Sequence, residues 1–319
     1  MRRAVASAFA VSCLAFSVST AVNGASLLTS DQELVPTGKG WGERPAPAPG
    51  PGQGMGQGQG QPQGQGKPSR PTSGSNGIDY HGGPVILGTT NVYYIWYGNW
   101  SGNTASTILE NLASSIGGSP YFSINTSYYN GSNAHVSNSV NFVTSTTDNY
   151  SQGKSLTDAG VQAVVANATK TLGHDTNAVY FVLTSADVNE TSGFCTQYCG
   201  WHTHGTIAGM DIKYAFVGNP DRCPSACAEQ TTTSPNGNIG ADGMASIIAH
   251  ELEEAVTDPD LNAWYDRRGQ ENADKCAWTF GTTYASTNNS KANMRLGGKD
   301  YLIQQNWVNA SGGYCALTY

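Results

Sequence analysis

The stretch "AVYFVLTS" at residues 178–185 is an almost uninterrupted run of apolar, β-branched and aromatic side chains with the length of one strand. Such a run predicts a buried β-strand. The stretch before it, "SLTDAGVQAVVANATKTL" (155–172), has apolar residues at helical spacing, among them Val161, Val164, Val165 and Leu172. A helix that leads into a buried strand indicates a domain in which the two kinds of element are mixed.

The same mixture continues on both sides of this pair. "PVILGTTNVYYIWYG" (84–98), "HVSNSVNFVTSTT" (135–147) and "IKYAFVGN" (212–219) read as strand regions, and "TASTILENLASSI" (104–116) reads as a helix. The sequence therefore predicts a single α/β (α+β) domain, with a mixed sheet and flanking helices, and not a sandwich of two sheets.

Residues 1–24 have the form of a secretory signal peptide. Arg2 and Arg3 precede an apolar run at residues 4–16, and small residues follow it. The run is too short to span a membrane comfortably, and no later stretch approaches the roughly 20 apolar residues that a spanning helix needs. We therefore expect a secreted, extracellular protein without a membrane span.

Residues 25–77 form an N-terminal segment that ends in a stretch rich in Pro, Gly and Gln, from residue 44 onwards. This composition cannot bury a core and predicts a flexible linker. The globular domain is therefore expected over residues 78–319. Two roles stay open for the segment before it: a tether, or a pro-segment around residues 27–77 that is removed by cleavage.

Charge and cysteine content narrow the class of protein further. Without residues 1–24 the chain has 14 basic and 23 acidic residues, a net charge of −9, which argues against nucleic-acid binding. An even number of cysteines in an exported chain predicts three disulfides. The alternative is a zinc site made from the two C-x-x-x-C pairs. Spacing leaves the connectivity open, although a Cys276–Cys315 bond would tie down the C-terminal segment. The sequence has seven cysteines, of which Cys13 lies in the predicted signal peptide; the six that remain are Cys195, Cys199, Cys223, Cys227, Cys276 and Cys315.

N-x-S/T sequons are spread over the domain, which is consistent with a glycoprotein. They lie at Asn99, Asn125, Asn130, Asn149, Asn167, Asn189, Asn288 and Asn309.

Residues typical of metal chemistry gather in "IIAHELEEAVTDPDLNAWYD" (247–266). We predict a helix over residues 243–256 with Asp242 as its N-cap. His250 and Glu254 lie one turn apart on one side of this helix. The opposite side is the expected buried face, a stripe of Ile248, Leu252, Ala255 and Val256.

The pattern H-E-x-x-E resembles the H-E-x-x-H of zinc hydrolases. There the residues at i and i+4 ligate the metal, and the Glu at i+1 activates a water. By this comparison His250 and Glu254 are candidate metal ligands, and Glu251 is the candidate catalytic residue. With Glu254 in place of a second His, the site would suit Mn²⁺ or Ca²⁺ as well as Zn²⁺.

Several residues are candidates for a further ligand. Asp260 lies ten residues after His250, a spacing used by metalloproteases with H-E-x-x-H-x-x-G-x-x-H/D, although Thr257 replaces their glycine. The histidines of "CGWHTHG" (199–205) point to the same side if that segment is extended. The candidate third ligands are thus Asp258, Asp260, His202 and His204. Downstream carboxylates could complete this site or form a second, calcium-like one: Asp266, Glu271 and Asp274.

An alternative explanation needs no metal. A single H-E pair on an acidic helix is common, and Glu251, Glu253 and Glu254 could form a solvated face.

Several segments together resemble the EXORDIUM, or phosphate-induced, protein family. They are "YHGGPVILGTTNVYYIWYG", "VLTSADV", "GFCTQYCGWHTHG", "YAFVGNPDRCPSAC", "PNGNIGADGMASIIAHELEEAVTDPDLNAWYD" and "NADKCAW", in this order over residues 78–319. The resemblance implies an apoplastic or cell-wall glycoprotein associated with growth, brassinosteroid response and carbon or phosphate status. It implies no particular biochemical activity, and here the family's helix has the H-E-x-x-E pattern.

Two hypotheses follow. The first is a secreted metal-dependent hydrolase, a peptidase of zincin-like architecture that acts on a peptide or protein substrate. The second is a noncatalytic extracellular protein whose acidic site is structural or binds calcium, and whose partner is a component of the cell wall.

Overall fold

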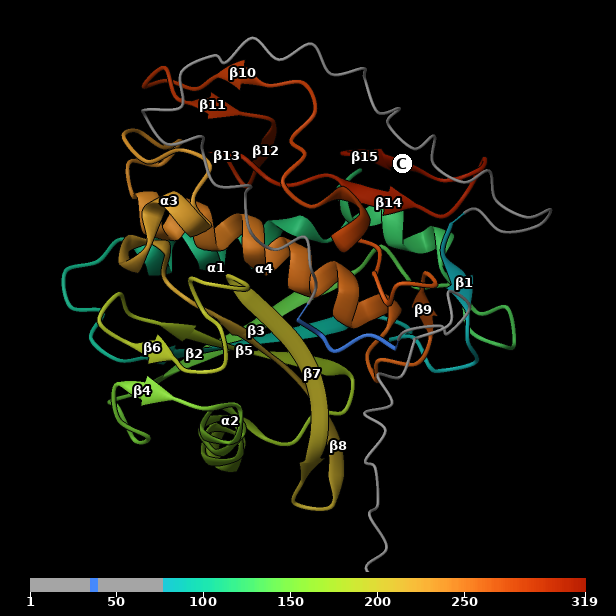
Figure 1. Cartoon of the computed structure of the whole chain (residues 1–319), viewed down its shortest axis with the longest axis horizontal. Coiled ribbons are helices and arrows are strands. Elements are labelled where there is room, and N and C mark those ends of the chain that lie inside the picture. The colour runs from blue at the N-terminus through green and yellow to red at the C-terminus, as the bar shows by residue number, and fades with distance from the viewer. Residues whose placement is uncertain (1–34, 40–76) are drawn as a thin grey trace, which may run out of the picture. The chain divides into compact units, whose positions relative to one another are not determined.

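The computed structural model describes residues 35–39 and 77–319 (Figure 1). The predicted signal peptide and most of the predicted linker lie outside the described residues. Within these two ranges, no helix has both the length and the apolar character needed to cross a membrane.

A five-stranded mixed sheet forms the centre of the domain, in the order β3-β2-β5-β8-β7. β3, β2, β5 and β8 run parallel, and β7 returns antiparallel to β8 at the edge. The strand predicted from "AVYFVLTS" is confirmed as the middle strand, and all of its residues are buried. The strands are β2 (Thr90–Tyr97), β3 (Val140–Asp148), β5 (Ala178–Thr184), β7 (Gly200–Ile207) and β8 (Met210–Val217).

Helices cover both faces of this sheet. α2 (Asp158–Leu172) lies on one face, and α1 (Ala105–Ile116) and α4 (Ile239–Thr257) lie on the other, as Figure 1 shows. α1 and α2 confirm the two helices predicted outside the H-E-x-x-E segment. The prediction of a mixed α/β domain with flanking helices is confirmed as well.

The remaining elements are short. They form two-stranded ribbons and single helical turns, and the ribbons of the C-terminal part lie over α4 on the side away from the sheet (Figure 1). The ribbons are β1 (Asp79–Tyr80) with β9 (Trp264–Tyr265), β4 (Ser155–Leu156) with β6 (Asn189–Glu190), β10 (Tyr284–Ala285) with β11 (Lys291–Ala292), β12 (Met294–Leu296) with β13 (Lys299–Tyr301), and β14 (Asn306–Val308) with β15 (Tyr314–Ala316). The short helices are η1 (Phe122–Ser127), η2 (Pro220–Arg222), α3 (Pro224–Cys227) and η3 (Asp274–Cys276).

α4 begins earlier than the sequence predicts. Its N-cap is Asn238, whose side chain accepts a hydrogen bond from the Ala241 amide, so the prediction of Asp242 as N-cap is wrong. Asp242 lies in the first turn and accepts hydrogen bonds from the backbone and side-chain amides of Asn236. α4 therefore has one more turn at its N-terminus than predicted and begins directly after the loop at residues 234–238.

α4 also has no solvated side. Every residue from Met244 to Thr257 is buried, because the sheet covers one side of the helix and the C-terminal segment crosses the other. For example, the Gln304 amide donates to Ser246 Oγ, and Asn306 Nδ2 donates to Glu253. The prediction of a single buried stripe is therefore wrong, and so is the alternative in which the glutamates form a solvated face.

Three disulfides confirm the prediction from the cysteine count and rule out the zinc alternative: Cys195–Cys223, Cys199–Cys227 and Cys276–Cys315. The first two join the two C-x-x-x-C segments side by side. They tie the start of β7 to α3, which precedes α4 in the chain.

One sequon is not accessible in the folded domain. Asn125 is fully buried in η1, and its Nδ2 donates to the Phe122 carbonyl at 3.2 Å. The other predicted sequons lie at exposed or half-buried positions. Glycosylation at Asn125 would therefore have to precede folding and would prevent this packing.

Candidate metal centre

The start of β7 packs closely against α4. A Cβ atom at Gly200 would lie 2.5 Å from Ile247 Cγ2 and 2.9 Å from Glu251 Oε1, so only glycine fits there without displacing the helix. Two residues further along β7, His202 lies on the side of the sheet that faces α4 and is 1% exposed. The close approach of strand and helix thus brings His202 near the residues of the H-E-x-x-E segment.

A first cluster forms around His250. Its Nε2 lies 3.1 Å from Glu254 Oε1 and 3.7 Å from Asp274 Oδ1, and all three side chains are 1% exposed. Nε2 of His250 and Oδ1 of Asp274 have no hydrogen-bond partner among the described residues. Ligand atoms about 2.0–2.2 Å from a tetrahedral metal lie about 3.4 Å from one another, so these distances suit a shared cation.

A second cluster forms around His202. Its Nε2 lies 3.1 Å from Glu271 Oε1 and 3.7 Å from Glu254 Oε2. The two oxygens of Glu254 therefore face two different imidazoles. Burial lowers the pKa of His202 to about 4, which leaves its ring neutral at pH 7. Each cluster contains three residues that could hold a metal ion, and Glu254 belongs to both.

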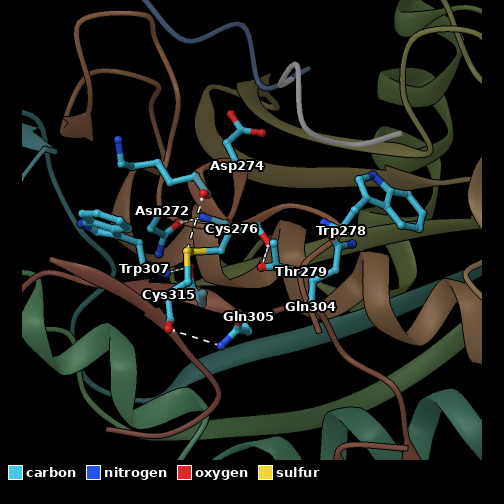
Figure 2. Close-up of a disulfide and its surroundings, with 12 residues drawn as sticks. Asn272, Asp274, Cys276, Trp278, Thr279, Gln304, Gln305, Trp307 and Cys315 are labelled. Carbon is cyan, nitrogen blue, oxygen red and sulfur yellow. Dashed lines mark hydrogen bonds between the residues drawn. A yellow bond between two sulfur atoms is a disulfide. The ribbon is translucent and has the colours of Figure 1, made fainter. Parts of the chain in front are cut away.

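A covalent link anchors the loop that supplies Glu271 and Asp274. Cys276, two residues after Asp274, is bonded to Cys315 of β15, and Figure 2 shows Asp274 near this disulfide. Asn272, between the two acids, donates from Nδ2 to the Glu253 carbonyl of α4 at 3.2 Å. The Asp274 amide also donates to Glu254 Oε1 at 3.0 Å. These bonds hold both carboxylates against α4.

Buried acids outnumber buried bases around this centre. Six carboxyl groups are 0–5% exposed: Glu251, Glu253, Glu254, Asp258, Glu271 and Asp274. In the described part of the chain, the basic side chains that contact them are the imidazoles of His202 and His250. Buried carboxylates without counter-charges are strongly destabilising, so the set is suited to a bound cation.

The pKa shifts reflect this imbalance. Burial raises the pKa of Glu251, of Glu253 and of Glu271 well above the ordinary value. Burial alone would lower the pKa of His250, but Glu254 and Asp274 outweigh it and raise that pKa well above its usual range. The electrostatic potential of these buried carboxyl groups therefore favours a positively charged group or ion at the centre.

Glu251 stands apart from both clusters. Its side chain is fully buried, and neither carboxylate oxygen has a hydrogen-bond partner among the described residues. A buried carboxylate in this state is rare in folded proteins and calls for a specific explanation. Its place beside His250 and Glu254 is the place of the proton acceptor in H-E-x-x-H enzymes.

Asp258 is not brought into either cluster. Its Oδ1 accepts hydrogen bonds from the amides of Asn262 and Ala263, both at 2.6 Å, and so fixes the turn after α4. Burial raises the pKa of Asp258 to about 7. Asp266 likewise accepts from backbone amides and from Lys275, in a turn of its own.

His204 and Asp260 meet in a separate, half-buried cluster. Nδ1 of His204 lies 2.8 Å from Asp211 Oδ1 and 3.7 Å from Asp260 Oδ1. The Lys213 ammonium lies 2.5 Å from Asp211 Oδ2 and 3.1 Å from Asp260 Oδ1. This cluster, which we call the His204 cluster, has its own cation, and it does not include His250. The sequence analysis did not identify Asp211 or Lys213.

Comparisons with known proteins agree with the resemblance noted in the sequence. The model of the phosphate-induced protein 1 conserved region matches residues 78–301. The chain is 33% identical to EXORDIUM-like 3 of Arabidopsis thaliana over 276 residues, 74% of this chain and 81% of the relative. It is 36% identical to EXORDIUM-like 5 of the same plant over 214 residues, 58% of this chain and 59% of the relative. PHOSPHATE-INDUCED 1 of Nicotiana tabacum is 29% identical over 217 residues, 59% of this chain and 67% of the relative. No solved structure matches.

Proposed function

The chain belongs to the EXORDIUM, or phosphate-induced, protein family, and we propose that it is a secreted member that acts as a metal-dependent hydrolase, namely a zincin-like peptidase. The observation that carries this proposal is the state of Glu251. It is a fully buried carboxylate without a hydrogen-bond partner among the described residues, next to His250 in an H-E-x-x-E helix. A buried carboxyl group in that state calls for a specific explanation, and the role of proton acceptor beside a metal ion provides one.

The ligands in this proposal are His250, Glu254 and Asp274, and the contacts of Glu254 with His202 extend the set to Glu271. Zn²⁺ is the first candidate, and the number of carboxylates makes Mn²⁺ or Ca²⁺ the alternatives. When bound, such an ion lowers the pKa of a water molecule and polarises a carbonyl group.

Glu251 has the role of the general base. Its carboxylate accepts a proton from the attacking water and passes it to the leaving amine of the cleaved peptide. Burial favours this role, since a carboxyl group with a raised pKa is a stronger base than an exposed one. His250 and Glu254, on the same turn of α4, fix the position of the reacting groups relative to Glu251.

Secretion is part of the same proposal. Three disulfides support it, because such bonds persist in oxidising compartments, and the predicted signal peptide at residues 1–24 provides the route. The exposed sequons would then be available for glycosylation, and the substrate would be a peptide or a protein outside the cell.

Elemental analysis of the secreted protein tests the metal. We expect close to stoichiometric zinc in the wild type and in His204→Ala, and loss of the metal in His250→Ala. The two variants differ in location: His250 belongs to the candidate metal centre, whereas His204 belongs to the separate His204 cluster. If neither the wild type nor His204→Ala contains bound zinc, manganese or calcium, the hydrolase proposal is wrong.

Glu251→Gln then tests the mechanism. This variant should keep its metal and lose hydrolysis of a peptide library by at least about 100-fold, since general-base catalysis contributes about 10²–10⁴. A fully active Glu251→Gln would eliminate Glu251 as the base.

One observation favours a second function. The candidate ligands and Glu251 are almost completely buried, which is typical of closed structural metal sites. A noncatalytic extracellular protein with a structural or calcium-type cation would show a bound metal in wild type and in Glu251→Gln alike. It would cleave no peptide, and chelation would unfold it.

A further inference from the structure

We propose that the outer edge of β7 is a binding edge for a peptide with a basic side chain, and that the chain's own residues 35–39 ("VPTGK") occupy it. This inference rests on the proposed peptidase function, because that function makes the bound peptide a substrate. It specifies the class of substrate, namely a peptide with a basic side chain. Its structural basis is independent of any metal.

The first observation is a backbone contact. β7 is the last strand of the sheet, so one row of its amides and carbonyls faces away from β8. On that side the His202 amide donates to the Gly38 carbonyl at 3.2 Å. Hydrogen bonding of a peptide backbone to an open strand edge is a common mode of peptide recognition, and here the bond is made at a bend over residues 38–39.

The fit at Gly38 is specific. This residue is buried and has a φ of +67°, and a Cβ atom on it would lie 1.9 Å from the His202 carbonyl oxygen. Any other residue would be strained in this conformation and would overlap the strand. A segment that packed loosely would not require glycine at this position. The close contact of residues 35–39 with β7 therefore depends on Gly38.

The second observation is the site that holds the Lys39 side chain. Its Nζ donates to Asp158 Oδ2 and to Ser192 Oγ, both at 2.7 Å. The same atom lies 5.3 Å from the ring centroid of Tyr198 and 5.2 Å from that of Trp201. A carboxylate together with two aromatic faces is a good binding site for a cation.

A second carboxylate lies behind this site. Glu190 is 1% exposed and accepts hydrogen bonds from the Ser192 amide at 2.9 Å and from the Tyr198 hydroxyl. Its Oε1 has no hydrogen-bond partner in the described part of the chain. Burial raises the pKa of Glu190, whereas at Asp158 hydrogen bonds from Lys39 and Ser192 outweigh burial and lower the pKa, so Asp158 supplies the negative charge that would accept Lys or Arg and repel an acidic side chain.

His202 links this edge to the candidate metal centre. Its backbone amide bonds to Gly38, and its imidazole faces Glu254 and Glu271. A peptide laid along β7 therefore passes over a residue of the centre. In this arrangement residues 35–39 block the edge, and another peptide can bind only after they leave.

The test uses the full chain with single substitutions. Gly38→Ala should displace residues 35–39, whereas Gly102→Ala is the control, because Gly102 has a φ of +71° and nothing within 4 Å of its Cβ position. Hydrogen exchange at the His202 amide and fluorescence anisotropy of a labelled Val-Pro-Thr-Gly-Lys peptide are the two readouts. Neither requires a metal or turnover.

We expect faster exchange at the His202 amide in Gly38→Ala only, and peptide binding at least about tenfold tighter than in the wild type or Gly102→Ala. A peptide ending in Glu should not bind, and adding Asp158→Asn should weaken binding of the Lys peptide by roughly tenfold. Equal binding of both peptides, or unchanged exchange and no binding in Gly38→Ala, overturns the inference. If the metal and hydrolysis experiments fail while selective binding is observed, the edge is a noncatalytic peptide site and only the proposed function is lost.

Discussion

Two histidines lie two residues apart on β7, and each contacts two carboxyl groups. One of the two clusters is buried, and the other is partly exposed to solvent. His202 contacts the fully buried Glu254 and Glu271, and the cluster around His250 shares Glu254 with it. His204 contacts Asp211 and Asp260, which are 43% and 17% exposed and are joined by the Lys213 ammonium. The described residues thus supply an ammonium group to the exposed cluster, whereas the basic side chains that they bring to the buried clusters are the imidazoles of His202 and His250.

This difference shows why geometry alone does not identify a metal site. All three clusters contain one imidazole and two carboxylates at distances that could hold a metal ion. In the His204 cluster, Lys213 already balances the acids, and nearby water screens the remaining charge. Around the buried clusters the described residues supply no ammonium group, and the positive charge comes from His250, whose pKa the neighbouring carboxylates raise; one imidazole does not balance so many acids, and an external cation would.

The largest effect expected from this comparison is on metal affinity. Asp274→Asn keeps the shape and the hydrogen bond to the Glu271 amide but removes a charge from the buried centre. We expect it to weaken metal binding by more than about 100-fold, because even indirect partners of a metal contribute 10–100-fold. Asp260→Asn, in the His204 cluster, should leave the affinity unchanged. Competition titration with a metal-sensitive dye measures both, and an equal loss in the two variants would contradict the distinction between the clusters.

The second effect tests the close packing of β7 on α4. Gly200→Ala should lower the free energy of unfolding by about 3 kcal/mol and disturb the centre, since the new methyl group would meet Ile247 and the Phe216 carbonyl. Gly205→Ala, near the other end of the strand, would overlap the flexible amide of Gln162 and lie at ordinary contact distance, 3.5 Å, from Tyr214 Cε1, so it should cost less than about 1 kcal/mol.

Urea unfolding of the two glycine variants, each with and without added metal, provides the measurement. If Gly205→Ala is the more harmful change, the buried centre is not built on the contact of β7 with α4.

The third effect comes from removing the internal cation. Lys213→Met leaves Asp211 and Asp260 without their ammonium partner. We expect the free energy of unfolding to fall by about 1.5 kcal/mol, which lies between the contributions of exposed and of buried ion pairs. Lys170→Met is the control, because Lys170 is exposed on α2 and, among the described residues, donates to the amide oxygen of Asn167 and contacts no carboxylate. Thermal unfolding measures the difference. A divalent cation should restore part of the stability of Lys213→Met, and no stability change relative to Lys170→Met would contradict the role of Lys213.

Much of this arrangement could be predicted from sequence because it depends on local patterns. The apolar runs and helical spacings identified four of the five strands of the central sheet and two flanking helices, and the even number of cysteines predicted the disulfides. The H-E-x-x-E spacing placed His250 and Glu254 on one side of a helix, where the structure has them. Periodicity and covalent pairing are properties of short segments, so a single sequence reveals them.

The remainder depends on contacts between distant segments. α4 is buried all round because the segment at residues 302–306 crosses it, and no periodicity within the helix records that contact. The selection of Asp274 over Asp260 depends on the loop held by the Cys276–Cys315 bond. Lys213 could have been found only from the β7–β8 register, which pairs it with His204.

The smallest effect is a pH dependence confined to the His204 cluster. Partial burial would raise the pKa of Asp211, but hydrogen bonds from Lys213 and His204 outweigh it and lower that pKa below the ordinary value. A carboxyl whose pKa is lower in the folded than in the unfolded state stabilises the fold above the unfolded pKa, about 4, and loses this contribution as the pH falls through the folded pKa. The wild type should therefore exceed Asp211→Asn in stability at pH 5–7, by less than about 1 kcal/mol because the side chain is 43% exposed, and the difference should become smaller as the pH falls below about 4. Denaturant unfolding at pH 7, 5 and 3 measures this difference in stability.

A difference that grows towards low pH would mean that Asp211 is destabilised by its neighbours, and the His204 cluster would then lack the charge balance that distinguishes it from the buried centre.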